Sequence, residues 1–331
     1  MEEQKEIEFR LLCYNPEVDI KAYFKTFSIE LEKGVTILRA INYIKDHVDP
    51  TITFRHFCQA GICGSCAMRI NGVSKLACTT QVWDELENCP EEGVIVVEPM
   101  NNMDVIRDLV TDMDPVMDKL KEYHCWVEPN TEDSKLGVKE TSVSPEEFET
   151  IEFATDCILC AACYSECSMC TVNDQYISPL VMLRAYRMNK DTRDSAAEER
   201  TKILVKDNGA WDCTHCYKCV EHCVMNIPIM TAIMGVRKEA LDRGLVKSEG
   251  ARHAMAFNDD IYSHGRLREV TLPIRTLGVK KTIAMAPFAL KMASKNRVPP
   301  LFPKPTSEQK NVKKMFKQYE QEKISEKKGN P

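Results

Sequence analysis

Residues 58–66 read Cys58-Gln-Ala-Gly-Ile-Cys63-Gly-Ser-Cys66, and Cys78 follows after eleven further residues. Gaps of four and two residues between the first three cysteines are typical of a plant-type [2Fe–2S] site. Thiolates are soft, anionic ligands that suit iron–sulfur cores, and the two glycines permit the tight turns that wrapping a cluster requires. A structural zinc site is the alternative, although zinc sites rarely use such a triple with glycines between the ligands. The stretch therefore predicts a [2Fe–2S] centre on these four cysteines.

Two further cysteine arrays, 56 residues apart, repeat one spacing of two, two and three intervening residues. They consist of Cys157, Cys160, Cys163 and Cys167, and of Cys213, Cys216, Cys219 and Cys223. This is the bacterial [4Fe–4S] spacing, in which the fourth cysteine of each run binds the other cluster. The usual proline after the fourth cysteine is replaced by Ser168 and by Val224, and a two-zinc module is the alternative. The predicted ligand sets are Cys157, Cys160, Cys163 and Cys223 for the first cubane, and Cys167, Cys213, Cys216 and Cys219 for the second.

The cysteine content favours metal binding over disulfide formation. The chain has 16 cysteines in 331 residues, and in a reducing compartment that many thiols usually bind metals. Cys170 is close enough to the second array to be a spare ligand. The four cysteines outside the arrays are otherwise expected to be buried free thiols: Cys13, Cys89, Cys125 and Cys170. A net charge of −6 is too small to indicate a nucleic-acid partner.

The N-terminal part, residues 1–115, is predicted to be a small β-rich domain. Apolar and polar residues alternate over 6–12 and over 24–31, as they do in half-buried strands, and 93–98 is a further strand. Residues 35–48 instead have apolar residues close to helical spacing, which predicts a helix between the second strand and the cysteine loop.

Residues 116–260 are predicted to be helical, and residues 261–331 form a basic extension. Ser144 and Ser178 are each followed by proline, which is typical of a helix start. The extension carries 16 Lys and Arg against 5 Asp and Glu, a net charge of +11, so the rest of the chain carries −17. Its end, residues 307–331, is rich in Lys, Glu and Gln and is expected to be disordered.

Sequence signatures of substrate catalysis are missing, since there is no G-x-G-x-x-G loop, P-loop or nucleophile–base motif. No apolar run approaches the roughly 20 residues that a membrane span needs. The acidic start, Met1-Glu-Glu-Gln-Lys-Glu, is unlike a signal peptide. We therefore expect a soluble or peripheral chain, which a signal-bearing partner could still carry across a membrane.

Residues 54–72, followed by Leu76-Ala-Cys78, closely resemble the iron–sulfur subunits of succinate dehydrogenases and fumarate reductases. Residues 105–113 resemble that family's link between its first two domains. The resemblance implies an α+β fold, with an N-terminal β-grasp plant-type ferredoxin domain followed by an α-helical ferredoxin domain. It also implies a partner subunit that carries FAD and interconverts succinate and fumarate. Electrons would then pass from the flavin through [2Fe–2S] and the two cubanes to a quinone or another carrier.

Two departures from the family pattern concern the third array. Many members lack the cysteine at the position of Cys216 and hold a [3Fe–4S] cluster there. Here Cys216 supplies a fourth ligand, so [4Fe–4S] is predicted for the second cubane, with [3Fe–4S] as the alternative. Many members also place a Trp and a His beside that cluster to help bind quinone, and the matching positions here are Val172 and Thr214. Contact with the quinone is therefore expected to be indirect.

The basic extension resembles the end of the C subunit of heterodisulfide reductases over 272–281, 286–293 and 299–303. That subunit docks a cysteine-rich B-type partner, so the likeness implies a variant succinate dehydrogenase whose membrane anchor is replaced by such a subunit. The complex is expected to be peripheral on the cytoplasmic face of a prokaryotic membrane, with the periplasmic face as the alternative. A thiol- or heterodisulfide-linked fumarate reductase is the alternative function, and a structural zinc or redox-sensing module is a third interpretation.

Overall fold

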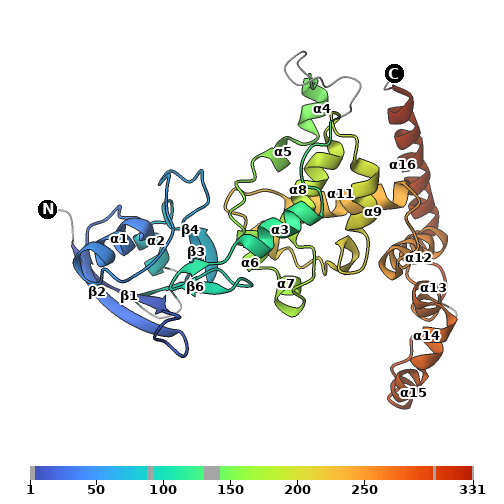
Figure 1. Ribbon diagram of the computed structural model, residues 1–331. Helices are drawn as coiled ribbons and strands as arrows, with labels where there is room; N and C mark the ends of the chain where they lie inside the picture. Colours follow the sequence, from blue (N-terminus) through green and yellow to red (C-terminus); the bar gives the residue numbers. More distant parts are fainter. Residues whose placement is uncertain (1–3, 88, 90–92, 130–141, 301–302, 330–331) are drawn as a thin grey trace. The chain divides into compact units, whose positions relative to one another are not determined.

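The computed structural model describes residues 4–87, 89, 93–129, 142–300 and 303–329 (Figure 1). The predictions that fall on the first three residues, on the last two and on 301–302 lie outside the described residues. The chain forms two compact units, Met1–Glu239 and Ala240–Pro331, each of which is described by itself.

A five-stranded mixed sheet forms the N-terminal part, with the strand order β2-β1-β5-β3-β4. Its strands are β1 (Lys5–Cys13), β2 (Tyr23–Leu31), β3 (Ala67–Ile70), β4 (Val73–Leu76) and β5 (Val94–Glu98). β1 pairs antiparallel with β2 and parallel with β5, so Phe9 lies between Phe27 and Ile95. β3 pairs antiparallel with both β4 and β5. A separate two-stranded sheet joins β6 (Val105–Arg107) to β7 (Val110–Thr111).

The alternating sequence pattern explains how this sheet buries one face. Phe9 and Leu11 of β1 are fully buried, because successive side chains of a strand point to opposite faces. Helix α1 (Ile37–His47) contributes Ile41 to the same core, and the Thr36 side chain caps the helix by accepting a hydrogen bond from the backbone. The predicted strands and the predicted helix over 35–48 are confirmed.

Mostly short helices follow, of which α2 packs against the sheet core and the helices from α3 to α11 surround a second hydrophobic core. The helices are α2 (Val82–Glu87), α3 (Asp114–Glu122), α4 (Pro145–Glu149), α5 (Glu152–Thr155), α6 (Ala162–Ser165), α7 (Ser168–Val172), α8 (Pro179–Lys190), α9 (Ala197–Leu204), the 3₁₀ turn η1 (Ala210–Asp212), α10 (Lys218–Glu221) and α11 (Ile229–Asp242). Ser144 forms a capping box with Glu147 at the start of α4, and Ser178 caps α8. Both predicted helix starts are confirmed, and α8 lies at the centre of the core.

A polar cluster joins the sheet to the helical part within the N-terminal unit. The Arg69 guanidinium donates to Glu166 at 3.2 Å and to Glu98 at 3.3 Å. The Ser74 hydroxyl, at the end of the sheet, donates to Glu166 at 2.6 Å and lies 3.0 Å from the Ser165 hydroxyl. Because Glu166 directly precedes the fourth cysteine of the second array, these contacts place that array relative to the sheet.

The C-terminal unit consists of helices α12 (Glu249–His264), α13 (Leu272–Leu277), α14 (Val279–Ala284), α15 (Ala286–Ser294) and α16 (Gln309–Gly329). The Asp260 carboxylate has no exposed side-chain surface and accepts from Arg268 at 2.9 Å and from Arg275 at 2.7 Å. The rings of Tyr262 on α12 and Phe316 on α16 lie 5.5 Å apart. Helix α16 lies in the end that was expected to be disordered, and its polar composition does not reveal its contact with α12.

The compact units also differ from the predicted boundaries at 115/116 and 260/261. Helix α12 begins at Glu249 and belongs with the C-terminal unit because Asp260 and Tyr262 connect it to α13 and α16. The N-terminal unit contains both the sheet core and the helical core, so the first predicted boundary lies inside one compact unit. None of the helices in the described part of the chain is long and apolar enough to cross a membrane.

Candidate iron–sulfur centres

Backbone N–H groups of the first cysteine loop point at cysteine sulfurs. The N–H groups of Ile62 and Cys63 donate to the Cys58 sulfur at 3.4 and 3.3 Å, and the N–H of Gly61 donates to the Cys78 sulfur at 3.3 Å. Hydrogen bonds of this kind stabilise charge on thiolate and cluster sulfur. The loop therefore offers preformed hydrogen-bond donors to an anionic cluster.

The β3–β4 hairpin brings the other two ligands of the predicted [2Fe–2S] site together. Cys66 directly precedes β3 and Cys78 follows β4, and the N–H of Ala77 donates to the Cys66 carbonyl at 3.1 Å. Burial raises the pKa of Cys66 to about 12, whereas a hydrogen bond with the Ser65 side chain lowers the pKa of Cys63 to about 6. The four thiols thus combine a buried side and a more exposed side around one loop.

The second and third arrays share one backbone conformation. Leu159 and Ala161 have φ values of 57° and 63°, and His215 and Tyr217, 56 residues later, have 56° and 64°. Each array then enters a one-turn helix, α6 or α10, at the equivalent position. Because positive φ is uncommon outside glycine, its recurrence at matching positions indicates one local structure used twice. The internal repeat predicted from the cysteine spacing is present in the fold.

One cavity is lined by cysteines from both of these arrays: Cys157, Cys160, Cys163 and Cys223. Leu180 and Leu183 of α8 supply part of its apolar wall. The N–H of Ile227 donates to the Cys223 sulfur at 3.3 Å. Burial raises the pKa of Cys163 well above its usual value, so a thiolate there would need nearby positive charge such as iron. This grouping is the one that the first predicted cubane requires, and the ligation itself stays a prediction.

The remaining array cysteines form a second group: Cys167, Cys213, Cys216 and Cys219. Burial, together with the neighbouring Cys213, Cys167 and Cys216 thiols, raises the pKa of Cys219 to about 12. Cys167 and Cys219 are buried, whereas Cys216 is exposed. Cys170 lies in this group as a fifth thiol, and its hydrogen bond lowers the pKa of Cys167 to about 6. The role of Cys170 as a spare ligand stays a prediction.

The cysteines outside the arrays differ in burial. All sixteen cysteines are free thiols, and Cys13 and Cys170 are buried as predicted, but Cys89 and Cys125 are only half-buried.

Within the described ranges, no three or more His, Cys, Asp or Glu side chains form a recognisable site for a metal ion.

Arg237 of α11 holds the third array in place, and the sequence interpretation missed it. Its buried guanidinium donates to the carbonyl oxygens of Ala210 and Cys213, both at 2.9 Å, and to that of Trp211 at 3.2 Å. It also contacts the His215 ring, and burial together with the Arg237 charge lowers the pKa of His215. A single arginine directly after the largely apolar stretch 229–236 of α11 is the signal that could have identified this residue.

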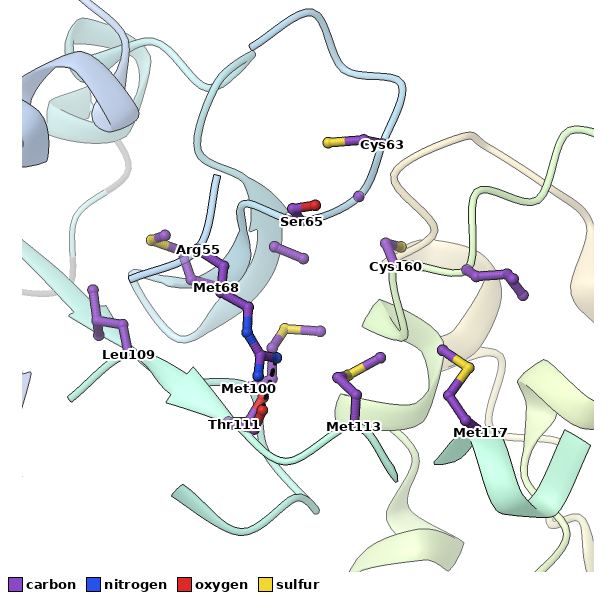
Figure 2. Close-up of a pocket in the computed structure, with 13 residues that line it drawn as sticks. Arg55, Cys63, Ser65, Met68, Met100, Leu109, Thr111, Met113, Met117 and Cys160 are labelled. Carbon is purple, nitrogen blue, oxygen red and sulfur yellow. Dashed lines mark hydrogen bonds between the residues drawn. The ribbon is translucent and has the colours of Figure 1, made fainter. Parts of the chain in front are cut away.

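Gly64 brings the first array against the second. A Cβ atom on Gly64 would lie 3.0 Å from the Cβ of Cys160, and Gly64 has a φ of 73°. Figure 2 shows Cys63 and Cys160 on loops that border one pocket, which Met113 and Met117 also line. Because electron transfer slows steeply with distance, this close approach favours transfer between centres held on the two loops.

The comparisons with protein families match both halves of the N-terminal unit. The family described as "2Fe-2S iron-sulfur cluster binding domain" matches residues 8–118, and the "4Fe-4S dicluster domain" matches residues 153–227. These matches include all twelve array cysteines. The predicted α+β fold, a 2Fe-2S ferredoxin domain followed by a helical 4Fe-4S domain, is confirmed.

Curated relatives match about two thirds or more of this chain and three quarters or more of their own length. The 8-methylmenaquinol:fumarate reductase iron-sulfur subunit of Wolinella succinogenes is 33% identical over 85% of this chain and 88% of its own. The fumarate reductase iron-sulfur subunit of Mycobacterium tuberculosis is 35% identical over 71% of this chain and 92% of its own. The mitochondrial succinate dehydrogenase [ubiquinone] iron-sulfur subunit of Dictyostelium discoideum is 36% identical over 66% and 75%.

A solved structure also has this fold. A chain of the Mycobacterium smegmatis Sdh1 complex in the apo form superimposes with a TM-score of 0.65 at 22% identity. The superposition covers 73% of this chain and 98% of that one.

Proposed function

Because the chain belongs to the family of iron–sulfur subunits of succinate dehydrogenases and fumarate reductases, we propose that its three arrays relay electrons between an FAD subunit and a quinone-linked membrane-side subunit. The chain is an electron-transfer subunit of an oxidoreductase complex and performs no substrate catalysis by itself. When bound, the clusters supply one-electron transfer. The residues of the chain hold the clusters, separate them and adjust their reduction potentials.

The ligand sets are part of this proposal. The [2Fe–2S] cluster is held by Cys58, Cys63, Cys66 and Cys78. The first [4Fe–4S] cluster is held by Cys157, Cys160, Cys163 and Cys223. The second is held by Cys167, Cys213, Cys216 and Cys219, and because it has four thiols it is a [4Fe–4S] rather than a [3Fe–4S] cluster. The observation that carries the proposal is the cavity that Cys223 shares with three cysteines of the other array.

The first cysteine loop is proposed to face the FAD subunit, on which succinate and fumarate interconvert. Phe57 and Ile62, which flank Cys58, are 82% and 69% exposed. Two large, strongly exposed apolar side chains on one short loop make this loop a candidate for an interaction surface. Docking there would place the flavin near the [2Fe–2S] site, and Gly64 at the far side of the same loop contacts the second array.

The C-terminal unit is proposed to dock the membrane-side subunit, of the cysteine-rich type found in heterodisulfide reductases. An open groove of about 580 Å³ is lined by apolar side chains that include Met285, Phe288 and Met292, and Phe288 is 59% exposed. The extension's charge of +11 suits a membrane-side position. The Wolinella relative also supports a docking role for the extension. Residues 1–260 make up under 80% of the chain, so a match over 85% of the chain includes part of the extension.

The proposed location is peripheral, at the cytoplasmic membrane of a prokaryote and on its cytoplasmic face. The periplasmic face is the alternative, reached with a signal-bearing partner. Two of the relatives' names contain a quinol or ubiquinone, which favours a quinone-linked complex over a thiol- or heterodisulfide-linked fumarate reductase.

The electron path is tested on the complex purified without air together with its copurifying subunits. Added succinate should reduce the clusters, and fumarate should reoxidise them, as followed by EPR. Cys58→Ser should remove the [2Fe–2S] signal and block reduction of the cubanes, whereas Cys89→Ser, outside the arrays, should behave like the unmodified chain. Copurification without a flavoprotein, or an unchanged Cys58→Ser spectrum, would contradict the proposal.

The docking surface has its own test. Phe288→Asp places a charge in the apolar groove and should abolish copurification of the membrane-side subunit while the three clusters remain. Met315→Asp is the matched control, because Met315 is 68% exposed on α16 and does not line the groove. Equal retention of the partner by both variants would exclude the groove as the docking site.

A further inference from the structure

Tyr176 has a hydroxyl group that the fold buries without a partner. The residue is 0% exposed, and its hydroxyl oxygen has no hydrogen-bond partner among the described residues. Buried hydroxyl groups are normally paired, because leaving one unpaired costs free energy of desolvation. An unpaired hydroxyl in this interior therefore indicates that a group bound at this place completes its hydrogen bonding.

The surroundings of this hydroxyl are thiols of the second cubane site. Burial raises the pKa of Tyr176 well above its usual value, and the neighbouring Cys213, Cys167 and Cys170 thiols and the approach of the Cys213 side chain to the hydroxyl raise it further. The group consequently remains a neutral O–H donor. Cys213 and Cys167 belong to different arrays, so the Tyr176 ring lies where the third array and the end of the second meet.

The backbone on both sides of Tyr176 is fixed. Lys119 of α3 donates to the carbonyl oxygens of Asp174 and Tyr176 at 2.5 and 2.6 Å. The N–H of Ile177 donates to the carbonyl of Asn208, five residues before Cys213, at 2.9 Å. These contacts tie the segment to α3 on one side and to the third array on the other, so the phenol has little freedom to turn away from the thiols.

We propose that the Tyr176 hydroxyl donates a hydrogen bond to sulfur at the Cys213–Cys167 side of the second cubane and raises its reduction potential. A donor to cluster sulfur stabilises the additional negative charge of the reduced state more than it stabilises the oxidised state. The inference rests on the proposed ligand set and goes beyond it, because it assigns the adjustment of one cluster's potential to a residue that binds no iron. Cysteine spacing alone carries no such information.

Tyr176→Phe removes the donor and keeps the ring. In the complex purified without air, an EPR-monitored redox titration should show a lower midpoint potential for the second cubane alone. Exchangeable-proton ENDOR should lose one coupling to that cluster. Tyr123→Phe is the matched control: Tyr123 is also buried in the helical core, but no cysteine contributes to its raised pKa. An unchanged midpoint in Tyr176→Phe, with three clusters present, would overturn the inference.

A second substitution covers the case in which Tyr176→Phe loses the cluster. Site-specific replacement of Tyr176 by 3-fluorotyrosine keeps the shape and makes the hydroxyl a stronger donor, so the midpoint of the second cubane should rise. A midpoint that stays constant or falls would overturn the inference. Failure of the ligand assignment is distinguishable, because the unmodified chain would then lack the signal of a second [4Fe–4S] cluster altogether.

Discussion

The two cubane sites use the same cysteine spacing and the same backbone turns but differ in their surroundings. The first is lined by Leu180 and Leu183 and has all its cysteines buried or half-buried. The second includes the exposed Cys216 and lies beside Tyr176 and a fifth thiol. Spacing therefore sets which kind of cluster can bind, whereas the neighbouring helices set how well each cluster is protected and how readily it is reduced.

Removing a ligand from the enclosed site should have the largest effect. Cys163→Ser leaves a weaker ligand in an apolar cavity, and we expect loss of the first cubane, no electron transfer to the second, and poor recovery of the folded chain. Iron content and EPR of the purified chain measure this. Retention of a first cubane with its normal spectrum would contradict the assignment of Cys163.

Arg237→Met should release the third array. The carbonyls of Ala210, Trp211 and Cys213 would lose their donor, and leaving buried acceptors unpaired lowers the free energy of unfolding by about 3 kcal/mol. Thermal unfolding measures this loss, and EPR should show partial loss of the second cubane only. Lys206→Met, at an exposed position before the third array, is the control and should leave both quantities unchanged.

Cys216→Ser should alter the second cubane without removing it. Because Cys216 is exposed, its iron is the one that solvent reaches, and its loss should convert [4Fe–4S] to [3Fe–4S]. EPR of the oxidised complex would show a new [3Fe–4S] signal, while the signal of the first cubane persists. An identical spectrum before and after substitution would mean that Cys216 binds no iron.

Gly64→Ala should have the smallest effect on stability, about 1 kcal/mol for a side chain in the left-handed region. Gly93→Ala is the matched control, because Gly93 has a φ of 78° but no atom within 4 Å of an added Cβ. In thermal unfolding Gly64→Ala should lose more stability than Gly93→Ala, because its Cβ also meets Cys160. Only Gly64→Ala should slow electron transfer from the [2Fe–2S] site to the first cubane, because its Cβ meets Cys160. Equal rates would show that this contact does not limit transfer.

Local sequence patterns predicted much of the fold. Alternation over 6–12 predicted β1, and the caps Ser144 and Ser178 predicted two helix starts, because these signals act within a few residues. Cysteine spacing predicted the grouping of Cys223 with the second array, since the rule for two-cluster modules contains that exchange.

The remaining features depend on residues far apart in the chain. Arg237 acts on carbonyls more than twenty residues away, and no short pattern marks that contact. The Tyr176 hydroxyl is distinctive only because the core encloses it. The composition of α16 suits both disorder and a solvated helix, and the contact between Phe316 and Tyr262 distinguishes them.

The central claim is that twelve thiolates hold three clusters in one chain, and a count of iron and acid-labile sulfide per chain tests it most directly. Protein matured and purified without air should contain roughly ten irons and ten sulfides, the total for one [2Fe–2S] and two [4Fe–4S] clusters. A chain that contained zinc in place of iron, with no labile sulfide, would contradict the account.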